Sequence, residues 1–220
     1  MNIARSIDHT LLKPDATREE ILKLCEEARE HGFFSVCVNS SRVALAAGAL
    51  NGSGVAVAAV TGFPLGAMSA EAKAFETKLA VAAGASEIDT VIAIGALKDG
   101  DSDYVLADLR GVVAAAGTAI VKVIFETCLL NKSEIITACQ LSVEAGAAFV
   151  KTSTGFSSGG ATVEAVQWMA AAVAGRCEVK ASGGIRDLES AQAMLAAGAT
   201  RLGTSNGIKI VNGEKATEGY

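Results

Sequence analysis

The segment AGAAFVKTSTG, residues 145–155, contains the end of a helix, a buried strand and a turn in direct succession. Gly146 predicts the helix end, because glycine readily adopts the left-handed backbone that closes a helix. The apolar and β-branched residues after it predict an interior strand, and Thr154-Gly155 predicts a turn. Lys151 interrupts this strand, where an ammonium group is costly to desolvate. The segment therefore predicts one unit of an α/β fold that carries a lysine near the end of its strand.

The same succession recurs along the chain. Ala-Gly-Ala ends a predicted helix at 83–85, 145–147 and 197–199, each time just before a strand. Helix starts are predicted, from residues that cap helices, at Thr17, Ser69, Asp101, Ser133, Thr162 and Asp187. Strands are predicted within 6–12, 33–39, 55–64, 87–95, 119–126, 149–155, 178–184 and 201–207. A short last helix is expected to begin near Ser205.

Eight strands that alternate with helices indicate parallel pairing through crossover connections. This number of units favours a single-domain (β/α)8 barrel of the α/β class, the TIM barrel, over an open doubly wound sheet. A length of 220 residues is long for an ordinary domain and normal for such a barrel. No linker is evident, so residues 1–220 are predicted to form one catalytic domain.

Composition excludes several classes of protein. Half of the residues are hydrophobic and a fifth are charged, which is typical of a globular chain. A net charge of -5 without a lysine–arginine cluster argues against nucleic acid as a partner. No apolar run approaches the roughly 18 residues of a membrane span. Five cysteines without a CxxC pair, and no signal peptide, predict reduced thiols in the cytoplasm.

Three lysines recur at one position of the repeat. Val-Lys pairs occur at 121–122, 150–151 and 179–180, so the lysines are 29 residues apart twice running. Successive side chains of a strand face opposite ways, so each lysine is expected inside the barrel and each valine towards the helices. Asp89 holds a comparable position in the preceding strand, EIDTVI. These four groups are expected to converge near the end of the barrel where active sites are built.

Two interpretations of this convergence remain open. The lysines and Asp89 could form a structural layer of salt bridges inside the barrel. Alternatively, crowding and desolvation lower the pKa of one lysine from about 10.4 towards about 7, which makes its amine a nucleophile at neutral pH. Asp89 would then be placed to move protons.

The loops after these strands predict a phosphate site. Glycines let backbone N–H groups approach an anion closely, and the start of a helix favours phosphate. The candidate phosphate-binding residues are Gly155, Gly183, Gly184, Ser205 and Asn206. His9 and His31 are too far apart in sequence for a zinc site, so no metal is expected. Neither GxGxxG after the first strand nor GxxxxGK[ST] occurs, so no nucleotide cofactor is expected.

Five motifs together resemble the deoxyribose-phosphate aldolase family of class I aldolases. They are DHTLLKP, EIDTVI, VKVIFET, VKTSTGF and VKASGGIR, in the family's order, and the match runs from Asp8 to Tyr220. The resemblance implies reversible cleavage of 2-deoxy-D-ribose 5-phosphate to D-glyceraldehyde 3-phosphate and acetaldehyde, without metal or other cofactor, in deoxynucleoside catabolism. It also implies a possible homodimer.

By this resemblance Lys151 matches the lysine that forms the Schiff base. Lys180 matches the second lysine, which lowers the pKa of the first and helps in proton transfer. Asp89 matches the aspartate that shuttles protons through a water. Lys122 is expected to be a supporting charge.

The chain departs from the family pattern in its phosphate loops. Phe156 stands where some members have a lysine, and Asn206 stands where a second serine is common. Arg186 is a candidate for the missing positive charge, with a surface role as the alternative. Tyr220 resembles the family's mobile terminal tyrosine, with a disordered tail as the alternative.

Two other functions were weighed against this aldolase. Another Schiff-base lyase, acting on a different phosphorylated sugar or keto acid, is permitted by the lysines but disfavoured by EIDTVI beside both V-K-x-S motifs. A barrel that only binds sugar phosphates is disfavoured because Lys151, Lys180 and Asp89 are all present.

Overall fold

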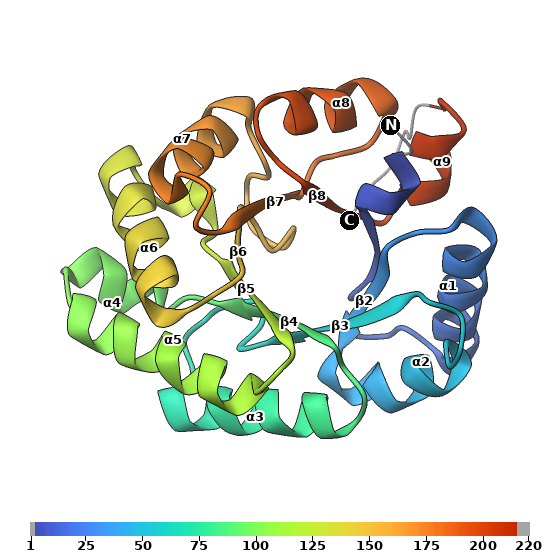
Figure 1. Cartoon of the computed structure of the whole chain (residues 1–220), viewed down its shortest axis with the longest axis horizontal. Coiled ribbons are helices and arrows are strands. Elements are labelled where there is room, and N and C mark those ends of the chain that lie inside the picture. Colours follow the sequence, from blue (N-terminus) through green and yellow to red (C-terminus); the bar gives the residue numbers. More distant parts are fainter. Residues whose placement is uncertain (1–2, 215–220) are drawn as a thin grey trace.

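The structure, a computed structural model, describes residues 3–214 and contains a closed barrel of eight parallel strands in sequence order, surrounded by helices (Figure 1). The predicted (β/α)8 barrel is confirmed. The strands are β1 Ile7–Leu11, β2 Ser35–Asn39, β3 Ala56–Thr61, β4 Glu87–Val91, β5 Ile120–Ile124, β6 Phe149–Lys151, β7 Glu178–Ser182 and β8 Arg201–Thr204. Each lies within its predicted segment.

The α-helices of the described residues are α1 Arg18–His31, α2 Val43–Ala49, α3 Ala70–Ala82, α4 Ile94–Asp99, α5 Ser102–Ala116, α6 Lys132–Ala145, α7 Val163–Val173, α8 Leu188–Ala196 and α9 Gly207–Val211. Short 3-10 helices occupy η1 Ile3–Ser6, η2 Ser40–Arg42 and η3 Thr127–Leu129. None of the helices within residues 3–214 is long and apolar enough to cross a membrane.

Side-chain caps explain where most helices begin. The predicted caps Thr17, Ser69, Asp101, Thr162 and Asp187 all accept a backbone N–H of the first helical turn. The prediction of Ser133 is wrong, because Asn131 caps α6 and accepts from the backbone N of Glu134 at 3.0 Å. Asn131 and Glu134 form a capping box that satisfies two backbone donors, so the helix begins before Ser133.

Helix α4 corrects a second boundary. Ile94 and Gly95 were predicted to extend a strand, but β4 ends at Val91 and α4 begins at Ile94. Gly100 ends this short helix in the left-handed conformation, with φ of 77°. The apolar run IAIG therefore changes from strand to helix without a polar residue that marks the change.

The core forms two layers that follow the alternation of side chains in the strands. Val121, Val150 and Val179 belong to the large apolar cluster outside the strands, packed against the helices. A small apolar cluster occupies the barrel interior and consists of Leu12, Cys37, Ala58 and Val60. Buried charged residues, among them Asp89, Lys122 and Lys180, occupy much of the remaining interior, which is unusual for barrels that fill with branched apolar residues.

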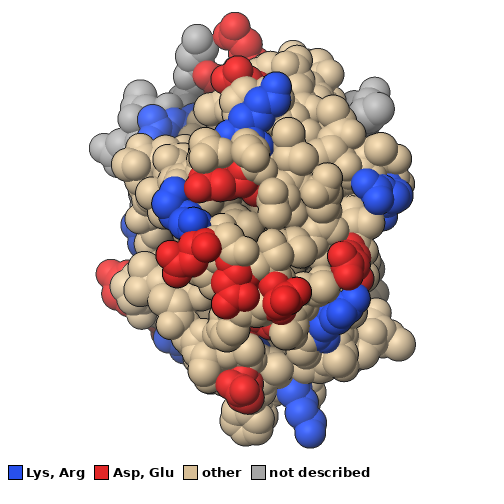
Figure 2. Space-filling model, turned by 90° about the vertical axis from the view of Figure 1, so that its left-hand side faces the viewer, with Lys and Arg blue, Asp and Glu red and all other residues tan. Residues whose placement is uncertain are grey.

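Acidic and basic side chains are interspersed on the surface that Figure 2 presents. Two ion pairs join neighbouring helices, Lys98–Glu134 between α4 and α6 and Arg110–Glu144 between α5 and α6. Figure 2 shows no continuous basic area on this face.

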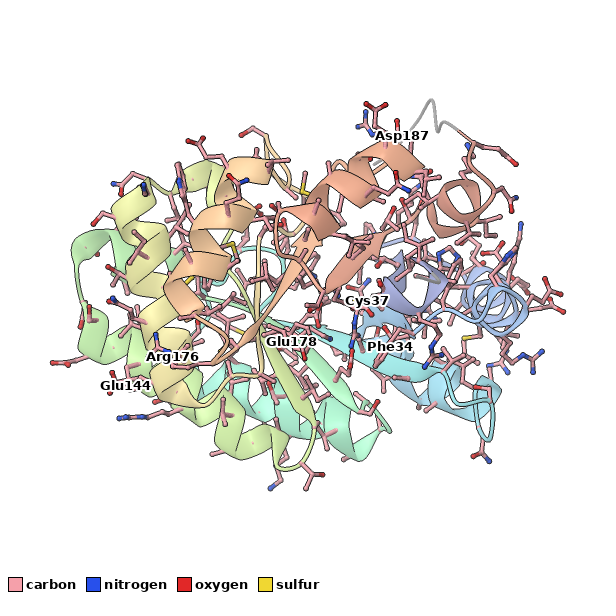
Figure 3. All side chains as sticks on the ribbon, turned by 45° about the horizontal axis from the view of Figure 1, so that its top comes forward. Phe34, Cys37, Glu144, Arg176, Glu178 and Asp187 are labelled. Carbon is pink, nitrogen blue, oxygen red and sulfur yellow. The ribbon has the colours of Figure 1, made fainter. Side chains whose placement is uncertain are left out.

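The amino-terminal end of the barrel is closed by a stacked cation. The Arg201 guanidinium lies 3.4 Å from the ring centroid of Phe34 and 5.3 Å from that of Phe149. Phe34 lies near the centre of the molecule in Figure 3, and Arg201 is buried. Contacts with aromatic rings stabilise a guanidinium that is removed from water. Active sites of such barrels lie at the opposite end, where the strands have their carboxyl termini.

A buried ion pair joins α3 to α5, and its loss should be costly. Lys73 Nζ lies 2.5 Å from Asp108 Oδ2, and neither side chain is exposed by more than 1%. Lys73→Met should lower the free energy of unfolding, measured in urea, by about 3 kcal/mol or more, because it leaves a buried carboxylate unpaired. The exposed Lys78 on the same helix provides the control Lys78→Met, expected to change stability by less than about 0.5 kcal/mol.

The double variant Lys73→Met, Asp108→Leu separates the pair from its packing. We expect it to recover most of the loss, because it removes both charges and keeps the volume filled. A single variant that loses less than about 1 kcal/mol would contradict the importance of this pair.

Candidate active site

Lys151, Lys180 and Asp89 meet inside the barrel. Lys151 Nζ donates to Asp89 Oδ2 at 2.9 Å, and Lys180 Nζ donates to the same oxygen at 2.7 Å. They come from β6, β7 and β4, and a contact between β4 and β7 must cross the interior because these strands are not neighbours. All three side chains are buried.

Lys122 occupies the other oxygen of Asp89. Its Nζ donates to Asp89 Oδ1 at 2.7 Å and to Glu87 Oε2 at 2.6 Å. Residues Asp89 and Lys122 are paired in the register of β4 and β5, which places both at the same height in the barrel. The predicted convergence of four groups is therefore what the structure contains.

Three further charged residues complete this network and were missed in the sequence. Asp8 on β1 accepts from Lys180 Nζ and, at 2.8 Å, from Arg201 Nη1. Arg201 on β8 also donates to Glu87 Oε2 at 3.2 Å. Alternation offered one signal: Glu87 lies two residues before Asp89 and so must share its inward face. For Asp8 and Arg201, single charges in different strands, we find no comparable signal.

Lys151 is the lysine that this environment pushes towards the uncharged form. Burial lowers the pKa of Lys151, and the neighbouring ammonium of Lys180 lowers it further, against the opposing effect of Asp89. Burial also works against the charged forms of Lys122 and Lys180, yet the carboxylates around them outweigh it and raise the pKa of both. The environment thus shifts the pKa of Lys151 in the opposite direction from the pKa values of Lys122 and Lys180, although all three are buried.

The two aspartates are held in the ionised form. Burial alone would raise the pKa of Asp89, but Lys122, Lys151 and Lys180 together hold it well below its usual range. For Asp8, Lys180, Lys122 and Arg201 likewise outweigh burial and keep the pKa low. At neutral pH both side chains therefore act as hydrogen-bond acceptors.

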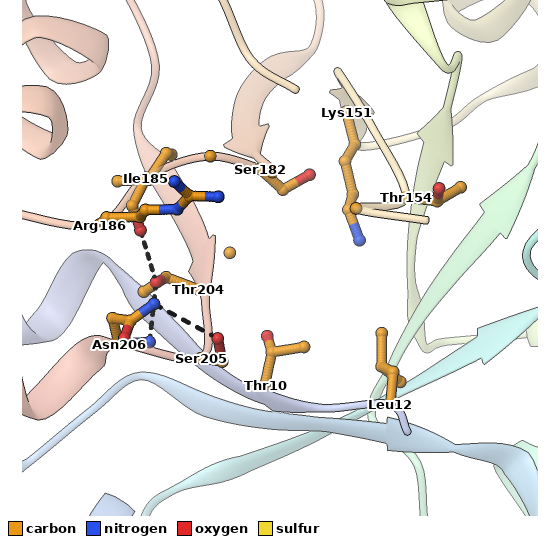
Figure 4. Close-up of a pocket in the computed structure, with 14 residues that line it drawn as sticks. Thr10, Leu12, Lys151, Thr154, Ser182, Ile185, Arg186, Thr204, Ser205 and Asn206 are labelled. Atoms are coloured by element: carbon orange, nitrogen blue, oxygen red, sulfur yellow. Dashed lines mark hydrogen bonds between the residues drawn. The ribbon is translucent and has the colours of Figure 1, made fainter. Parts of the chain in front are cut away.

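A pocket opens at the carboxyl ends of the strands, and the amine of Lys151 points into it (Figure 4). In this view Lys151 and Leu12 lie on one side, and Arg186 and Asn206 lie on the other. All of the predicted phosphate residues line the pocket, namely Gly155, Gly183, Gly184, Ser205 and Asn206. The pocket thus has the Lys151 amine on one side and Arg186 and Asn206 on the other.

Two loops of the pocket approach each other too closely for side chains. A Cβ on Gly160 would lie 2.3 Å from the carbonyl oxygen of Gly183. Gly183 itself has φ of 81°, in the left-handed region. Ala161 N donates to the carbonyl oxygens of Ser182 and Gly183, which joins the loop after β6 to the loop after β7.

The departures noted in the sequence fall in different places. Arg186 is exposed and lines the pocket, as a source of positive charge should. Phe156 is 42% exposed, outside the pocket lining, and packs edge-on against Phe63 with ring centroids 5.3 Å apart. Asn206 donates its backbone N–H to Thr204 Oγ1 at 2.9 Å. Tyr220 lies outside the described residues.

Glu126 contacts Thr154 of the pocket lining and was not among the residues predicted from the sequence. Its backbone is left-handed, with φ of 57°, which is rare for a residue with a side chain. Its buried carboxylate accepts from the Thr154 hydroxyl and, at 3.3 Å, from the Thr154 backbone N. Glu126 therefore fixes the start of the loop that includes Gly155. An outlier of this kind often accompanies a functional constraint.

The residues that the structure describes include no group of three His, Cys, Asp or Glu side chains arranged to hold a metal ion.

Cys37, the cysteine nearest the lysines, is buried, and burial raises the pKa of its thiol.

Known aldolases resemble the chain over its whole length. The sequence model described as DeoC/LacD family aldolase matches residues 3–213. A deoxyribose-phosphate aldolase of a Geobacillus species is 59% identical over 220 residues, covering 100% of this chain and 99% of the relative. One from Alkaliphilus oremlandii is 60% identical over 222 residues, covering 100% of both.

A solved structure agrees with these sequence relatives. The deoxyribose phosphate aldolase from Aeropyrum pernix, described as tetrameric, superposes with a TM-score of 0.89 at 34% identity. The superposition covers 96% of this chain and 89% of that chain.

The support from Glu126 can be tested through anion binding. Glu126→Ala removes both acceptors of Thr154, so the loop loses its anchor and inorganic phosphate should bind the pocket about tenfold more weakly, by titration calorimetry. Glu126→Gln keeps an oxygen for the Thr154 hydroxyl and should stay within about threefold of the parent. Equal affinities for the parent and the alanine variant would show that the loop holds its position without Glu126.

Proposed function

Because the chain belongs to the DeoC/LacD family of aldolases, we propose that it cleaves 2-deoxy-D-ribose 5-phosphate reversibly to D-glyceraldehyde 3-phosphate and acetaldehyde. As a member of this family the chain is an aldolase, a carbon–carbon lyase. The observation that carries the proposal is the buried amine of Lys151, which faces the pocket and whose pKa is lowered. The relatives that bear the name of this aldolase give further support.

The reaction begins with the uncharged amine of Lys151. Its nitrogen attacks the aldehyde carbon of the open-chain sugar, and loss of water leaves a protonated imine joined to Nζ. A protonated amine has no electron pair for this attack, so the lowered pKa of Lys151 raises the reactive fraction at neutral pH.

The imine then accepts the electrons of the bond that breaks. A base removes the proton of the hydroxyl on C3, the bond between C2 and C3 breaks, and D-glyceraldehyde 3-phosphate leaves. The electron pair forms an enamine on Lys151. Protonation of the enamine carbon and addition of water release acetaldehyde and restore the amine. The covalent route divides one difficult step into easier ones.

Asp89 and Lys180 are proposed to move the protons. Asp89 is ionised and in direct contact with Lys151, so a water beside it has a ready acceptor. Lys180 shares the same Asp89 oxygen and remains cationic, so it supplies positive charge beside Lys151 and a proton within one hydrogen bond of Asp89. Lys122 holds the other oxygen of Asp89 and fixes its orientation.

The phosphate is proposed to bind at the glycine-rich end of the pocket. Gly155, Gly183, Gly184, Ser205 and Asn206 line that end, and Arg186 supplies a cation there. The distance between the two ends of the pocket then selects a sugar whose aldehyde and phosphate lie at opposite termini. Binding at the far end orients the reacting carbon against Lys151.

The proposal also includes the catalytic unit, the cofactor requirement, the oligomeric state and the location of the enzyme. The catalytic unit is the single domain of residues 1–220, it needs no metal or other cofactor, and it forms a homodimer. A cytoplasmic location follows from the substrate, because a charged sugar phosphate crosses membranes very slowly.

Trapping tests the assignment of the nucleophile. Incubation with acetaldehyde and borohydride should leave a two-carbon adduct on Lys151, located by peptide mass mapping, because borohydride reduces the imine to a stable amine. Lys151→Leu should carry no adduct and lose at least about a thousandfold in turnover, whereas the surface variant Lys78→Leu should match the parent. An adduct at Lys180, or none, would refute the assignment.

A substrate panel tests the reaction itself. We expect acetaldehyde to be the preferred donor in the synthetic direction. Preference for an acetyl or dihydroxyacetone donor would identify a different lyase, and binding of sugar phosphates without turnover would identify a binding protein.

Arg186→Gln tests the phosphate end of the pocket. We expect the KM for 2-deoxyribose 5-phosphate to rise about tenfold, because one charge-assisted contact is lost. With unphosphorylated 2-deoxyribose, kcat/KM should stay within about twofold of the parent. Arg176→Gln, in the turn before β7, is the matched control and should change neither value. An equal loss with both sugars would contradict a phosphate contact.

A further inference from the structure

The charged side chains inside the barrel form a closed ring of alternating sign. Asp89 contacts Lys122, Lys122 contacts Glu87, and Glu87 contacts Arg201, at 2.7, 2.6 and 3.2 Å. Arg201 contacts Asp8 at 2.8 Å, Asp8 contacts Lys180, and Lys180 returns to Asp89 at 2.7 Å. Three carboxylates and three cations thus compensate one another in the ring.

Lys151 lies outside this balance. Among residues 3–214 its one ion-pair contact is Asp89 Oδ2, an oxygen that Lys180 already occupies at the shorter distance. Each cation of the ring, in contrast, contacts at least two carboxylates of the ring. A proton on Lys151 would therefore add a positive charge to a buried group that is already neutral as a whole, and such a charge is costly.

We propose that Glu87 and Arg201, which lie outside the pocket lining, are positioning residues that keep Lys151 uncharged by completing the charge balance of the ring. Both act through other residues: Glu87 through Lys122, and Arg201 through Asp8. This inference rests on the proposed function only in taking Lys151 as the reactive amine.

Other strands of the barrel also present ionisable side chains to the interior that contains Lys151. Asp8 faces the interior from β1, Asp89 from β4, Lys122 from β5, Lys180 from β7 and Arg201 from β8. Cys37 on β2 is a thiol whose pKa is raised by burial, so it carries no charge at neutral pH. The inner residues of β3 are the apolar Ala58 and Val60. No remaining strand offers a charge that replaces the balance of the ring.

Removal of one ring charge at a time gives shifts of opposite sign. Glu87→Gln leaves the ring positive, so Lys151 should lose its proton more easily and the acidic limb of the pH–rate profile should move to lower pH. Arg201→Gln leaves the ring negative, so Lys151 should keep its proton longer and the limb should move to higher pH. Each shift should be on the order of one pH unit.

Two sets of variants separate charge from packing. The double variant Glu87→Gln, Arg201→Gln restores neutrality, and its acidic limb should return to within about 0.3 pH units of the parent. Arg201→Lys and Glu87→Asp keep the charges and should leave the limb in place. If Arg201→Gln does not fold, because its stack on Phe34 and Phe149 is lost, Glu87→Gln and Arg201→Lys still decide the question.

The experiment has two readouts. One is kcat/KM for 2-deoxyribose 5-phosphate cleavage against pH, which reports the free enzyme. The other is the titration of the Lys151 Nζ resonance by NMR in protein labelled with 15N-lysine, assigned by its absence in Lys151→Leu. The NMR titration tests the inference even if the sugar is not cleaved, a result that would refute the proposed function alone.

A merely structural role for the two residues has a different outcome. It would lower kcat or the melting temperature and leave both the limb and the Nζ titration unchanged, which would overturn the inference. Shifts of the same sign in Glu87→Gln and Arg201→Gln would overturn it as well. Opposite shifts that cancel in the double variant would establish it.

Discussion

The carboxylate of Asp89 receives hydrogen bonds from three lysines, and the interior of the barrel is arranged around it. One oxygen is held by Lys122, and the other is shared by Lys151 and Lys180. Where water is excluded, each buried cation needs a carboxylate nearby and each carboxylate needs a cation. The contacts of Asp89 link β4, β5, β6 and β7 in the interior, so a change at this residue would remove a contact of all three lysines.

The two ends of the barrel differ in structure, and the buried ion pairs lie between them. At the amino-terminal end, Arg201 is packed on Phe34 and Phe149, where it stabilises the fold and closes the interior. At the carboxyl end, glycine loops form a polar pocket beside Lys151. The ion pairs between the two ends form one connected network, which runs from Arg201 through Asp8 and Lys180 to Asp89 and Lys151. The surrounding helices pack against Val121, Val150 and Val179, which precede the three lysines in the same strands.

Much of the fold and the centre of the site could be predicted from the sequence, for particular reasons. The repeat of helix stop and strand gave the barrel, and the equal spacing of Lys122, Lys151 and Lys180 predicted their convergence. Asp8 and Arg201 could not be paired in advance, because they are 193 residues apart and their contact depends on barrel closure. Ser133 and Asn131 are both capable caps, and the capping-box spacing of Asn131 and Glu134 that distinguishes them is present in the sequence. The left-handed backbone of Glu126 could not be predicted, because glutamate is not a residue that usually adopts this conformation.

The stack of Arg201 on Phe34 and Phe149 occupies the amino-terminal end of the barrel interior, whereas the pocket that contains the Lys151 amine opens at the carboxyl end. In the proposed reaction both products would therefore leave by the carboxyl end. The two-carbon fragment joined to Lys151 would lie deeper than the phosphorylated product, so we expect the phosphorylated product to depart first.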